Sequence, residues 1–561
     1  MKPPKIIKTK LIQDNYGIWS TNTNHHFDYS DGDSAENYLW KTINKSKDLS
    51  SNSQELKKYI KDWPSEYHLS EKRSQLLSGF DFQKKGIVLE IGCGCGAITR
   101  FLSEQFETVI AIEGSRKRAR IAKQRTNDRN NVHIICANFQ DIDFTEKFDI
   151  VFCIGVLEYS GSFIQSPAPY DYVLKHLHKV ISKKGSLILS IENQFGLKYF
   201  NGYKEDHLNI PFVGIEGYAS TKKSVKTFGK EELTKMLNSY FANIQFFYPY
   251  PDYKLPDCVV SDEFFSIPNH GELISKFSKH RNRRRKRLWN EKLVSLELEK
   301  NNSLSFFSNS FLIAASNEKD SQLKFPQLGI FFSSKDRRQK FQTYNTIKYS
   351  NGEVRVSKHL LNGQSQSISK KLKLKPTTTL WQEKHSLQTI LFIRSQQKNM
   401  SLEEIFSPCK SWIEYLLSKC FVCSGQFYID GKFIDCIWPN FYPTNKSYTF
   451  IDDEWNWHSA IKLKTLFIRA AFNFVNETLY PYYPKDSTKT TILKILNSQN
   501  IAVTKSDFYD FLNFESDFQS IVTGHSKKFI FLKLLWKLNS LRSYNMFKKT
   551  LRSSFKTYYF F

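Results

Sequence analysis

The chain has 561 residues, of which 40% are hydrophobic and 15% are aromatic. A chain of this length exceeds one ordinary hydrophobic core, so we expect two domains, and the composition excludes a mostly disordered protein. The formal net charge of +26 points to anionic partners such as nucleic acid, phosphorylated glycans or an anionic membrane surface, and it does not choose among them.

The first residues and the cysteines bear on the compartment. The opening segment MKPPKIIKTKLIQDNYG lacks the apolar core of a signal peptide. No stretch reaches the roughly 18 uninterrupted apolar residues of a transmembrane helix. The nine cysteines, an odd number in a long chain, fit free thiols in a reducing compartment. We therefore expect a cytoplasmic protein, with a place on the inner face of the membrane as a compatible alternative.

The N-terminal part, residues 1–80, is polar and rich in aromatic side chains. Helical patterns occur near 34–46 and 53–62, and the apolar spacing that follows them predicts a helix starting near Ser70. We expect this part to be a helical segment that closes over a substrate.

An alternation of strands and helices fills the region 81–320. Short apolar runs bounded by turn residues predict strands, and the amphipathic stretches between them predict helices. This alternation is typical of a doubly wound parallel sheet, so we expect an α/β, Rossmann-like domain. The expected strands are 87–91, 108–113, 132–138, 148–155 and 185–193, and the expected helices are 97–106, 115–127 and 170–181.

The end of this domain carries an insertion. A helix is predicted at 230–241 and a strand at 243–250, and a last strand at 310–317 is expected to pair with that strand. The insertion, 251–306, contains the basic run KHRNRRRKR at 279–287. Such a run fits either phosphate binding or a solvated helix face.

A second domain is expected over 325–540. Residues 342–361 alternate in polarity and contain Asn351-Gly352, which predicts a β-hairpin. Helical patterns follow from about residue 400, so this domain should be α+β. The tail, 541–561, is basic and aromatic.

The stretch VLEIGCGCGAITRFL joins the first strand of the sheet to its first helix. Glycines let the backbone turn tightly and approach a ligand, and the N-terminus of the following helix faces that ligand. The loop therefore predicts a nucleotide-type cradle, although it also satisfies the dinucleotide pattern with Ala97 in the last position. The glycines of the loop are Gly92, Gly94 and Gly96.

Acidic residues near the loop favour S-adenosylmethionine (SAM) over a dinucleotide. Glu90 precedes the first glycine by two residues, and Glu113 ends the next strand, where a carboxylate would accept hydrogen bonds from both ribose hydroxyls. Asp141, after the third strand, is expected to bind the adenine amino group, and Phe139 to cover the ring. Gly155, after the fourth strand, is expected at the cofactor as well. Because SAM carries a sulfonium and an ammonium group, carboxylates suit it, whereas a pyrophosphate would favour amides and basic groups.

Several long motifs resemble a bacterial family of class I SAM-dependent methyltransferases associated with surface-polysaccharide (O-antigen) biosynthesis. The resemblance covers about residues 15–320. It implies an acceptor that is a sugar or a sugar phosphate, with polysaccharide-assembly glycosyltransferases as partners. The order of domains is also similar to that of the O-antigen chain-terminator enzymes, which join a methyltransferase to a kinase. The motifs are FDYSDGDSAEN, DWPSEYHLSEKR, GVLEYSG, SIENQFGLKYFNGYKEDHLNIPFVGIEGYA, TFGKEEL and PYPDYKLPDCVVSDEFF.

Candidate catalytic residues follow the fourth and fifth strands. In-line transfer of a methyl group needs positioning and, for an oxygen or nitrogen acceptor, a base. Glu158 and Tyr159 follow the fourth strand, where the methyl group should lie. His207, in KEDH, is the expected base, and the alternative is a loop histidine held by a neighbouring carboxylate for structure. His68 is expected to close over the pocket.

The second domain has the spacing of a phosphotransferase. Asp435 is followed after five residues by Asn440 and after twelve more by Asp452, as in kinases, where an aspartate orients the hydroxyl and two residues hold Mg²⁺. Lys358, after the hairpin, would contact the phosphates of ATP, and EKHSLQTIL resembles the hinge of aminoglycoside-phosphotransferase-like kinases. No glycine-rich loop precedes this lysine, and Phe433 stands where kinases have a histidine. An active kinase, a pseudokinase and an unrelated α+β domain therefore stay open.

Two alternatives for the whole chain also remain. The charge keeps a nucleic-acid (RNA) methyltransferase open, although GVLEYS stands after the fourth strand in place of an N-P-P-Y-type tetrapeptide. A non-catalytic SAM-binding scaffold with a pseudokinase module is the other. The four cysteines between 409 and 436 are not spaced as two close pairs, so we expect no metal cluster there.

Overall fold

The computed structural model describes residues 6–21, 30–82, 86–221, 225–277, 288–318, 323–333, 336–444, 447–479 and 486–539. The chain divides into two compact units. Unit 1 comprises residues 1–331 and 346–349, and unit 2 comprises 332–345 and 350–561. The N-terminal segment and the α/β region, expected as separate parts, thus belong to one unit, and the second domain begins a few residues later than expected.

The centre of unit 1 is a parallel sheet whose strands occur in the order β5-β4-β3-β6-β7. Its strands are almost wholly buried, as expected of apolar runs with helices on both faces. The prediction of a doubly wound α/β fold is confirmed. The strands are β3 (Ile87–Ile91), β4 (Thr108–Glu113), β5 (Val132–Cys136), β6 (Phe148–Ile154) and β7 (Ile181–Glu192).

The sheet continues beyond β7 with antiparallel strands. The predicted strand β10 (Ser310–Ser316) pairs with β8 (Asn243–Tyr250) as expected, and it also pairs with β7, so it lies between them. β9 (Cys258–Ser261) then pairs with β8, and β11 (Gly329–Phe332) pairs with β9.

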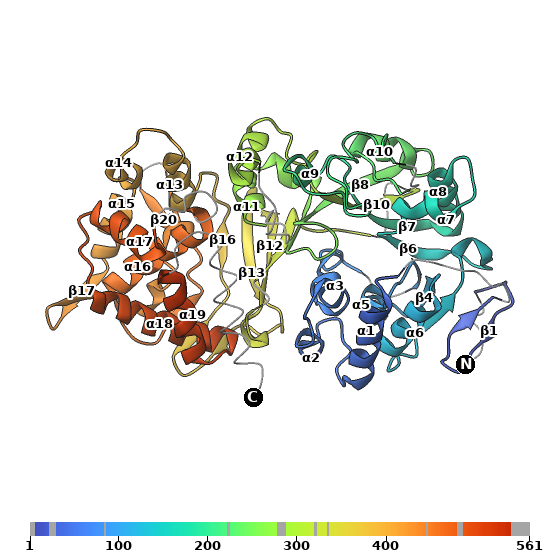
Figure 1. Ribbon diagram of the computed structural model, residues 1–561, viewed down its shortest axis with the longest axis horizontal. Coiled ribbons are helices and arrows are strands. Elements are labelled where there is room, and N and C mark those ends of the chain that lie inside the picture. The colour runs from blue at the N-terminus through green and yellow to red at the C-terminus, as the bar shows by residue number, and fades with distance from the viewer. Residues whose placement is uncertain are drawn as a thin grey trace. The chain divides into compact units, whose positions relative to one another are not determined.

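Helices cover both faces of the parallel sheet (Figure 1). Helices α5 (Ala97–Gln105) and α6 (Arg116–Arg125), which follow β3 and β4, lie on one side. Helices α8 (Pro169–Val180) and α10 (Lys230–Asn238) lie on the other side. The shorter helices of this part are η1 (Phe139–Asp141), η2 (Leu157–Tyr159), α7 (Ser160–Phe163) and α9 (Leu197–Phe200).

The N-terminal segment is not wholly helical, which corrects the prediction for residues 1–80. Strand β2 pairs in parallel with β5 and extends the sheet, and β1 pairs with β2. The helix expected near Ser70 is present as the short helix α4, which starts at Lys72. A separate helix, α3, begins before it at Trp63, because Asp62 and Ser65 form a capping box at its start. The elements are β1 (Ile12–Gln13), β2 (Trp19–Ser20), α1 (Asp33–Lys45), α2 (Gln54–Lys57), α3 (Trp63–Leu69) and α4 (Lys72–Gln75).

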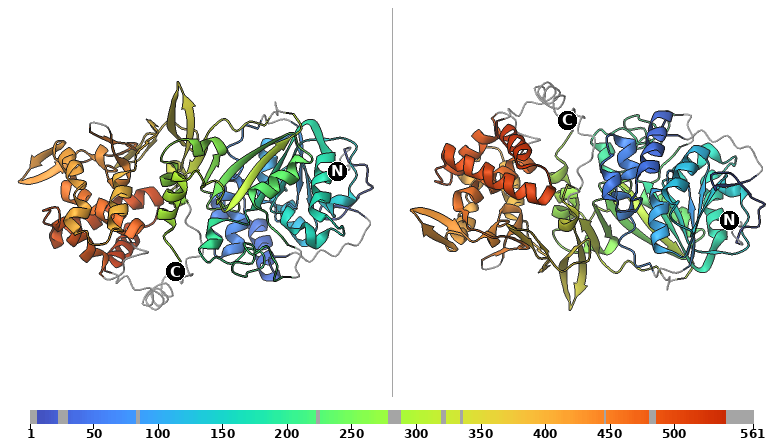
Figure 2. Two further views of the ribbon diagram at one scale, coloured as in Figure 1. Left: turned by 90° about the horizontal axis from the view of Figure 1, so that it is seen from above. Right: turned by 90° about the horizontal axis from the view of Figure 1, so that it is seen from below.

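The N-terminal helices pack against the helices that follow the glycine-rich loop, as Figure 2 shows in blue and light blue. One apolar cluster joins Leu39, Ile43 and Leu69 of the N-terminal part to Cys95 of the loop and Ile121 of α6. Cys95 is therefore a core residue.

The insertion contains η3 (Asp262–Ser266), α11 (His270–Phe277) and α12 (Glu291–Lys300). The basic run 279–287 and the tail 541–561 lie outside the described residues. Among the residues that are described, no helix combines the length and the apolarity needed to cross a membrane.

Unit 2 combines antiparallel strand pairs with helices, so the α+β expectation is confirmed. Asn351 and Gly352 adopt φ angles of 52° and 79° between β12 and β13, the positive values of the expected two-residue turn. The strands are β12 (Thr343–Ser350), β13 (Glu353–Leu360), β14 (Ser367–Ile368), β15 (Leu372–Leu374), β16 (Thr378–Leu380), β17 (Cys420–Cys423), β18 (Gln426–Ile429), β19 (Phe441–Pro443), β20 (Tyr448–Phe450), β21 (Trp455–Trp457) and β22 (Ile461–Lys462). The helices are η4 (Gln339–Phe341), α13 (Leu387–Ser395), α14 (Leu402–Phe406), α15 (Cys409–Leu417), η5 (Gly431–Phe433), η6 (Trp438–Asn440), α16 (Leu463–Phe474), η7 (Val475–Leu479), α17 (Thr488–Asn497), α18 (Lys505–Thr523) and α19 (Lys527–Asn539).

Candidate functional site

The glycine-rich loop between β3 and α5 has the conformation that its glycines permit. Gly92, Gly94 and Gly96 have φ angles of 70°, 55° and 82°, which side chains rarely allow. At Gly96, the residue before α5, an added Cβ would also lie 2.8 Å from the Cα of Ala122. The loop therefore lies directly against α6, and its backbone opens toward a cavity at the carboxyl edge of the parallel strands.

The cavity is walled by the loop, by the ends of β4 and β6, and by the N-terminal helices. Gly155 lines it, as predicted, directly after β6. The wall carries acidic, basic and aromatic side chains together. These are Tyr67, His68, Arg73, Glu90, Glu113, Arg118 and Tyr159.

Two of the predicted cofactor residues are carboxylates on this wall. Glu113 accepts hydrogen bonds from the backbone N–H of Gly94 at 2.7 Å and of Ser115 at 2.9 Å, so the end of β4 holds the loop in place. Glu90 is 4% exposed, and burial together with the charge of Glu113 raises the pKa of Glu90 to about 7. A cationic ligand group would offset this burial cost.

The other two predicted cofactor residues lie farther along the same sheet edge. Phe139 and Asp141 form η1 after β5, and the cavity wall does not include either of them. The Phe139 ring meets the ring of His176 edge-on at 5.8 Å. Their role at the adenine ring stays a prediction.

The N-terminal helices bring basic side chains to the cavity. His68 is bound through Nε2 to Asp31 at 2.8 Å. Burial lowers the pKa of His68 to about 4, so its ring is neutral at neutral pH. Arg73 lies over the ring of Tyr67 at 4.4 Å and donates to the backbone oxygen of Lys254 at 2.8 Å.

Arg73 and Arg118 were not identified from the sequence. Arg118 belongs to α6, whose first turns carry several basic residues in a row. Nothing in that pattern shows which of these basic residues faces the glycine-rich loop. Contact between segments distant in the chain decides which arginine lines the cavity.

His207, the expected base, is not among the residues that line the cavity. Its Nδ1 is bound to Glu205 Oε1 at 2.8 Å, and its ring meets Tyr159 edge-on at 5.1 Å. Burial alone would lower the pKa of His207, but the carboxylates of Glu192, Glu158 and Glu205 raise it to about 10. The imidazole is therefore held as a cation at neutral pH and is not available to take a proton from an acceptor.

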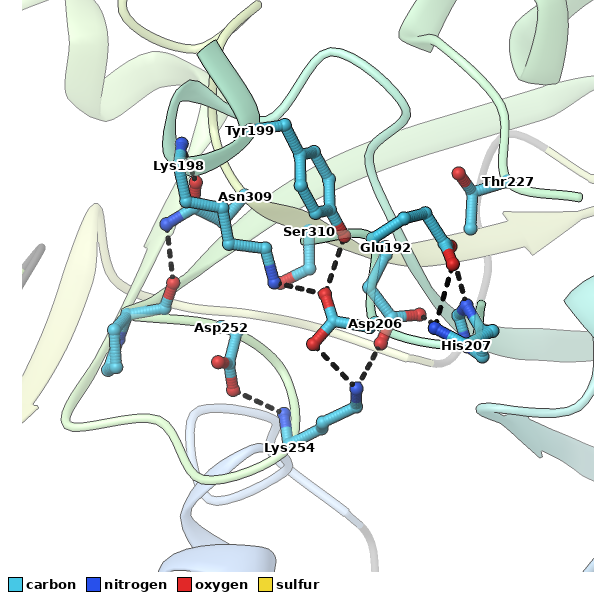
Figure 3. Close-up of polar contacts among 12 residues, drawn as sticks. Glu192, Lys198, Tyr199, Asp206, His207, Thr227, Asp252, Lys254, Asn309 and Ser310 are labelled. Carbon is cyan, nitrogen blue, oxygen red and sulfur yellow. Dashed lines mark hydrogen bonds and ion pairs between the residues drawn. The ribbon is translucent and has the colours of Figure 1, made fainter. Parts of the chain in front are cut away.

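A network of charged side chains continues from His207 across the ends of β7 and β8. Figure 3 shows the ammonium group of Lys254 between Glu192, at 2.6 Å, and Asp206, at 3.3 Å. Lys198 and the hydroxyl group of Tyr199 also bind Asp206 (Figure 3). Glu158 and Glu192, which end up side by side because β6 and β7 are neighbours, are wholly buried.

In unit 2 the structure brings Lys358 to Asp452, which binds its ammonium group. Glu454 binds the same group at 2.5 Å and was not predicted as its partner, because it lies 96 positions farther along the chain. Burial would raise the pKa of Asp452, but the charge of Lys358 holds it well below its ordinary value. Burial and the charge of Asp452 raise the pKa of Glu454 well above its ordinary value.

Asp435 and Asn440 also meet in unit 2. The Asn440 side chain donates to the backbone oxygen of Asp435 at 3.0 Å. The Asp435 carboxylate accepts from Arg469 at 2.6 Å, and Glu515 binds that arginine at 2.9 Å. Asp435 is thus tied to α16 and α18 rather than left mobile.

Comparison with known proteins identifies part of unit 1. Residues 89–189 match the family model described as a methyltransferase domain. An uncharacterized protein of Methanocaldococcus jannaschii is 30% identical over 156 residues, which are 26% of this chain and 61% of that protein. The ribosomal RNA small subunit methyltransferase A of Mycoplasma capricolum is 25% identical over 35% of this chain and 65% of its own. The malonyl-[acyl-carrier protein] O-methyltransferase of Priestia megaterium is 28% identical over 21% of this chain and 40% of its own.

The chain thus spans between 40% and 65% of the length of these curated relatives. Among solved structures, an N-methyltransferase from Bradyrhizobium japonicum matches with 16% identity and a TM-score of 0.24, over 35% of this chain and 89% of its own. The family match covers β3 to β7, the strands that carry the glycine-rich loop and most of the cavity wall. Residues 89–189 are therefore similar to a methyltransferase domain, which supports that prediction for part of the expected region 81–320.

Proposed function

We propose that unit 1 is a SAM-dependent methyltransferase and that its acceptor is a sugar or sugar phosphate used in surface-polysaccharide biosynthesis. The observation that carries the first part is the cavity beneath the glycine-rich loop. It lies within a methyltransferase domain, and the carboxylates of Glu90 and Glu113 form part of its wall.

The charges on the wall suit SAM better than a dinucleotide. SAM brings a sulfonium group, an ammonium group and one carboxylate, and the wall offers two carboxylates together with Arg73 and Arg118. Glu113 would bind the ribose hydroxyls with the lone pairs that its backbone contacts leave, and Glu90 would bind the ammonium group. Two phosphates would instead face two carboxylates in a buried place, which is strongly unfavourable.

The choice of acceptor rests on the long motifs that resemble polysaccharide-associated methyltransferases. Two of the relatives named above are described as methyltransferases of ribosomal RNA and of malonyl-[acyl-carrier protein], so they do not agree on one acceptor. An RNA methyltransferase and a non-catalytic SAM-binding scaffold are the alternatives. Polysaccharide-assembly glycosyltransferases and an anionic membrane surface are the partners that go with the favoured acceptor.

Transfer of a labelled methyl group tests this proposal. The full chain is incubated with methyl-labelled SAM and either a lipid-linked glycan fraction or RNA, and SAM binding is measured in parallel by calorimetry. We expect label in the glycan fraction and none with Glu113→Ala. Label in RNA alone would refute the acceptor, binding without any transfer would indicate a scaffold, and absence of SAM binding would refute the methyltransferase itself.

For unit 2 we propose a kinase-like nucleotide site built from Lys358 and Asp452. Support comes from their direct ion pair, which joins a strand lysine to an acid 94 positions later. Asn440 and Asp435 adjoin in the order that a Mg²⁺-dependent phosphotransferase requires. Calorimetry with Mg²⁺ and ATP tests the site. Binding without turnover would indicate a pseudokinase, and absence of binding would leave an unrelated α+β domain.

A further inference from the structure

We propose that Glu158, Glu192 and His207 form a buried binding site for one divalent transition-metal ion. Among the residues that the structure describes, each of these three offers one ligand atom, and the three atoms lie within 4.8 Å of one another. The residues come from η2, from the end of β7 and from the loop after α9. The site goes beyond methyl transfer, and its presence does not depend on that activity.

The spacing of the three side chains is that of ligands around a common point. Nε2 of His207 lies 3.6 Å from Glu158 Oε1 and 3.6 Å from Glu192 Oε2. These separations are too long for hydrogen bonds. An ion bonded to nitrogen and oxygen at about 2.1 Å holds neighbouring ligand atoms roughly 3.0–3.5 Å apart. The two separations from Nε2 are thus only slightly longer than those between neighbouring ligands of one ion.

The imidazole ring is oriented as metal-binding rings are. Glu205 accepts a hydrogen bond from Nδ1 of His207 and others from the backbone N–H groups of His207, at 2.8 Å, and Leu208, at 2.6 Å. With Nδ1 donating to Glu205, Nε2 faces Glu158 and Glu192, and an ion bound between them would displace the Nε2 proton and take its lone pair. A carboxylate behind the ring is the usual partner that fixes the tautomer of a metal-ligating histidine.

The carboxylates at this point are deeply buried and incompletely bound. The side chains of Glu158 and Glu192 are 0% exposed. Within the described part of the chain, Glu158 Oε2 and Glu192 Oε2 have no hydrogen-bond partner, while Lys254 binds the other oxygen of Glu192. Burying an unpaired carboxylate is costly. A cation between the two groups would remove that cost.

The wider charge balance points the same way. Four carboxylates, those of Glu158, Glu192, Glu205 and Asp206, gather around two ammonium groups, those of Lys198 and Lys254. Two negative charges are left over when the imidazole is neutral, and a divalent ion would neutralise them.

The donor set selects among ions. One imidazole nitrogen and two carboxylate oxygens suit Zn²⁺, Mn²⁺ or Fe²⁺, whereas Mg²⁺ and Ca²⁺ prefer oxygen ligands alone. Glu158 is adjacent to Tyr159, whose ring forms part of the cavity wall. A bound ion would therefore tie η2 to the end of β7 and brace this wall.

Binding of Mn²⁺ to the full chain, after removal of metal with a chelator, tests the site. Loss of the electron paramagnetic resonance signal of free Mn²⁺ gives stoichiometry and affinity, and competition with Zn²⁺ ranks the two ions. We expect about one ion per chain. Glu192→Gln and His207→Gln should weaken binding by at least about 100-fold, and Glu205→Gln by about 10-fold to 100-fold.

The matched control is Glu216→Gln, the same change at an exposed residue of the following segment, which should bind Mn²⁺ as the wild type does. Circular dichroism shows whether each ligand variant is folded. If one variant is not folded, the proposal is tested with the others. The proposal is refuted if the folded wild type binds neither ion, or if the ligand variants bind as tightly as the control. SAM binding is measured on the same samples, so loss of the ion site alone would leave the proposed methyltransferase standing.

Discussion

Replacing Glu90 by Gln should remove a pH-dependent part of the free energy of unfolding. The group has an ordinary pKa of 4.5, which we take for the unfolded chain, and burial raises the folded value to about 7. A raised folded pKa favours the folded state while the carboxyl is protonated, and this stabilisation is lost as the pH rises through 7. Between pH 5 and pH 8 these two values give a loss of about 2.5 kcal/mol.

The assay is denaturant unfolding of wild type and Glu90→Gln at pH 5 and at pH 8, followed by a probe in unit 1. The wild type should lose about 2.5 kcal/mol more than the variant on going from pH 5 to pH 8. The buried amide of the Gln variant changes the free energy of unfolding by the same amount at both pH values, so this change cancels when the two values are subtracted. An equal pH dependence in both proteins would show that Glu90 does not carry the raised pKa, and the reasoning about its burial would fail.

The same group predicts the pH dependence of SAM binding. If ionised Glu90 binds the ammonium group of SAM, binding requires the deprotonated form, which is abundant only above pH 7. The affinity of the wild type should then rise about tenfold between pH 6 and pH 8. Calorimetry at these pH values measures it, and the Gln variant should bind more weakly with no such rise.

Three further changes test other parts of the structure. Glu113→Ala removes the acceptor for the backbone of the loop and for the ribose, so SAM affinity measured by calorimetry should fall about 100-fold, whereas Glu216→Gln should leave it unchanged. Gly96→Ala brings a Cβ to 2.8 Å from the backbone of α6 and should lower the free energy of unfolding by about 3 kcal/mol. Gly217→Ala, also at positive φ but with nothing within 4 Å, should cost only about 1 kcal/mol, and equal costs would contradict the close packing of the loop. Asp452→Ala should abolish Mg²⁺-dependent ATP binding by unit 2, and unchanged binding would place any nucleotide elsewhere.

The central sheet and its glycine-rich loop were predictable because their signals are local. Buried parallel strands are continuous apolar runs, and β3, β4 and β6 coincide with those runs to within one residue at either end. The two-residue strands β1 and β2 are too short to leave any periodic signal. Their pairing with the sheet depends on tertiary contact alone.

For groups of side chains that come together from distant segments, the sequence predicted some members and not others. Lys358 was found from its place after a hairpin, but its second partner, Glu454, lies 96 positions later. Arg73 reaches the cavity from α4, the helix expected near Ser70, whereas the separate helix α3, which a capping box at Asp62 starts, was not predicted. Several polar residues in this segment could each start a helix, and the sequence alone does not show which of them does, because the choice depends on what the helix packs against.

The carboxylate cluster behind the cavity follows from the strand order. Glu158 follows β6 and Glu192 ends β7, and these strands pair in parallel, so both side chains emerge at the same edge of the sheet. That edge is where ligands bind in doubly wound sheets. Two carboxylates in such a place need a cation, and His207 supplies either an imidazolium or, with a metal ion, a ligand. Because Tyr159 borders both the cavity beneath the glycine-rich loop and His207, we expect a change in the ion or proton that the cluster holds to alter this part of the cavity wall.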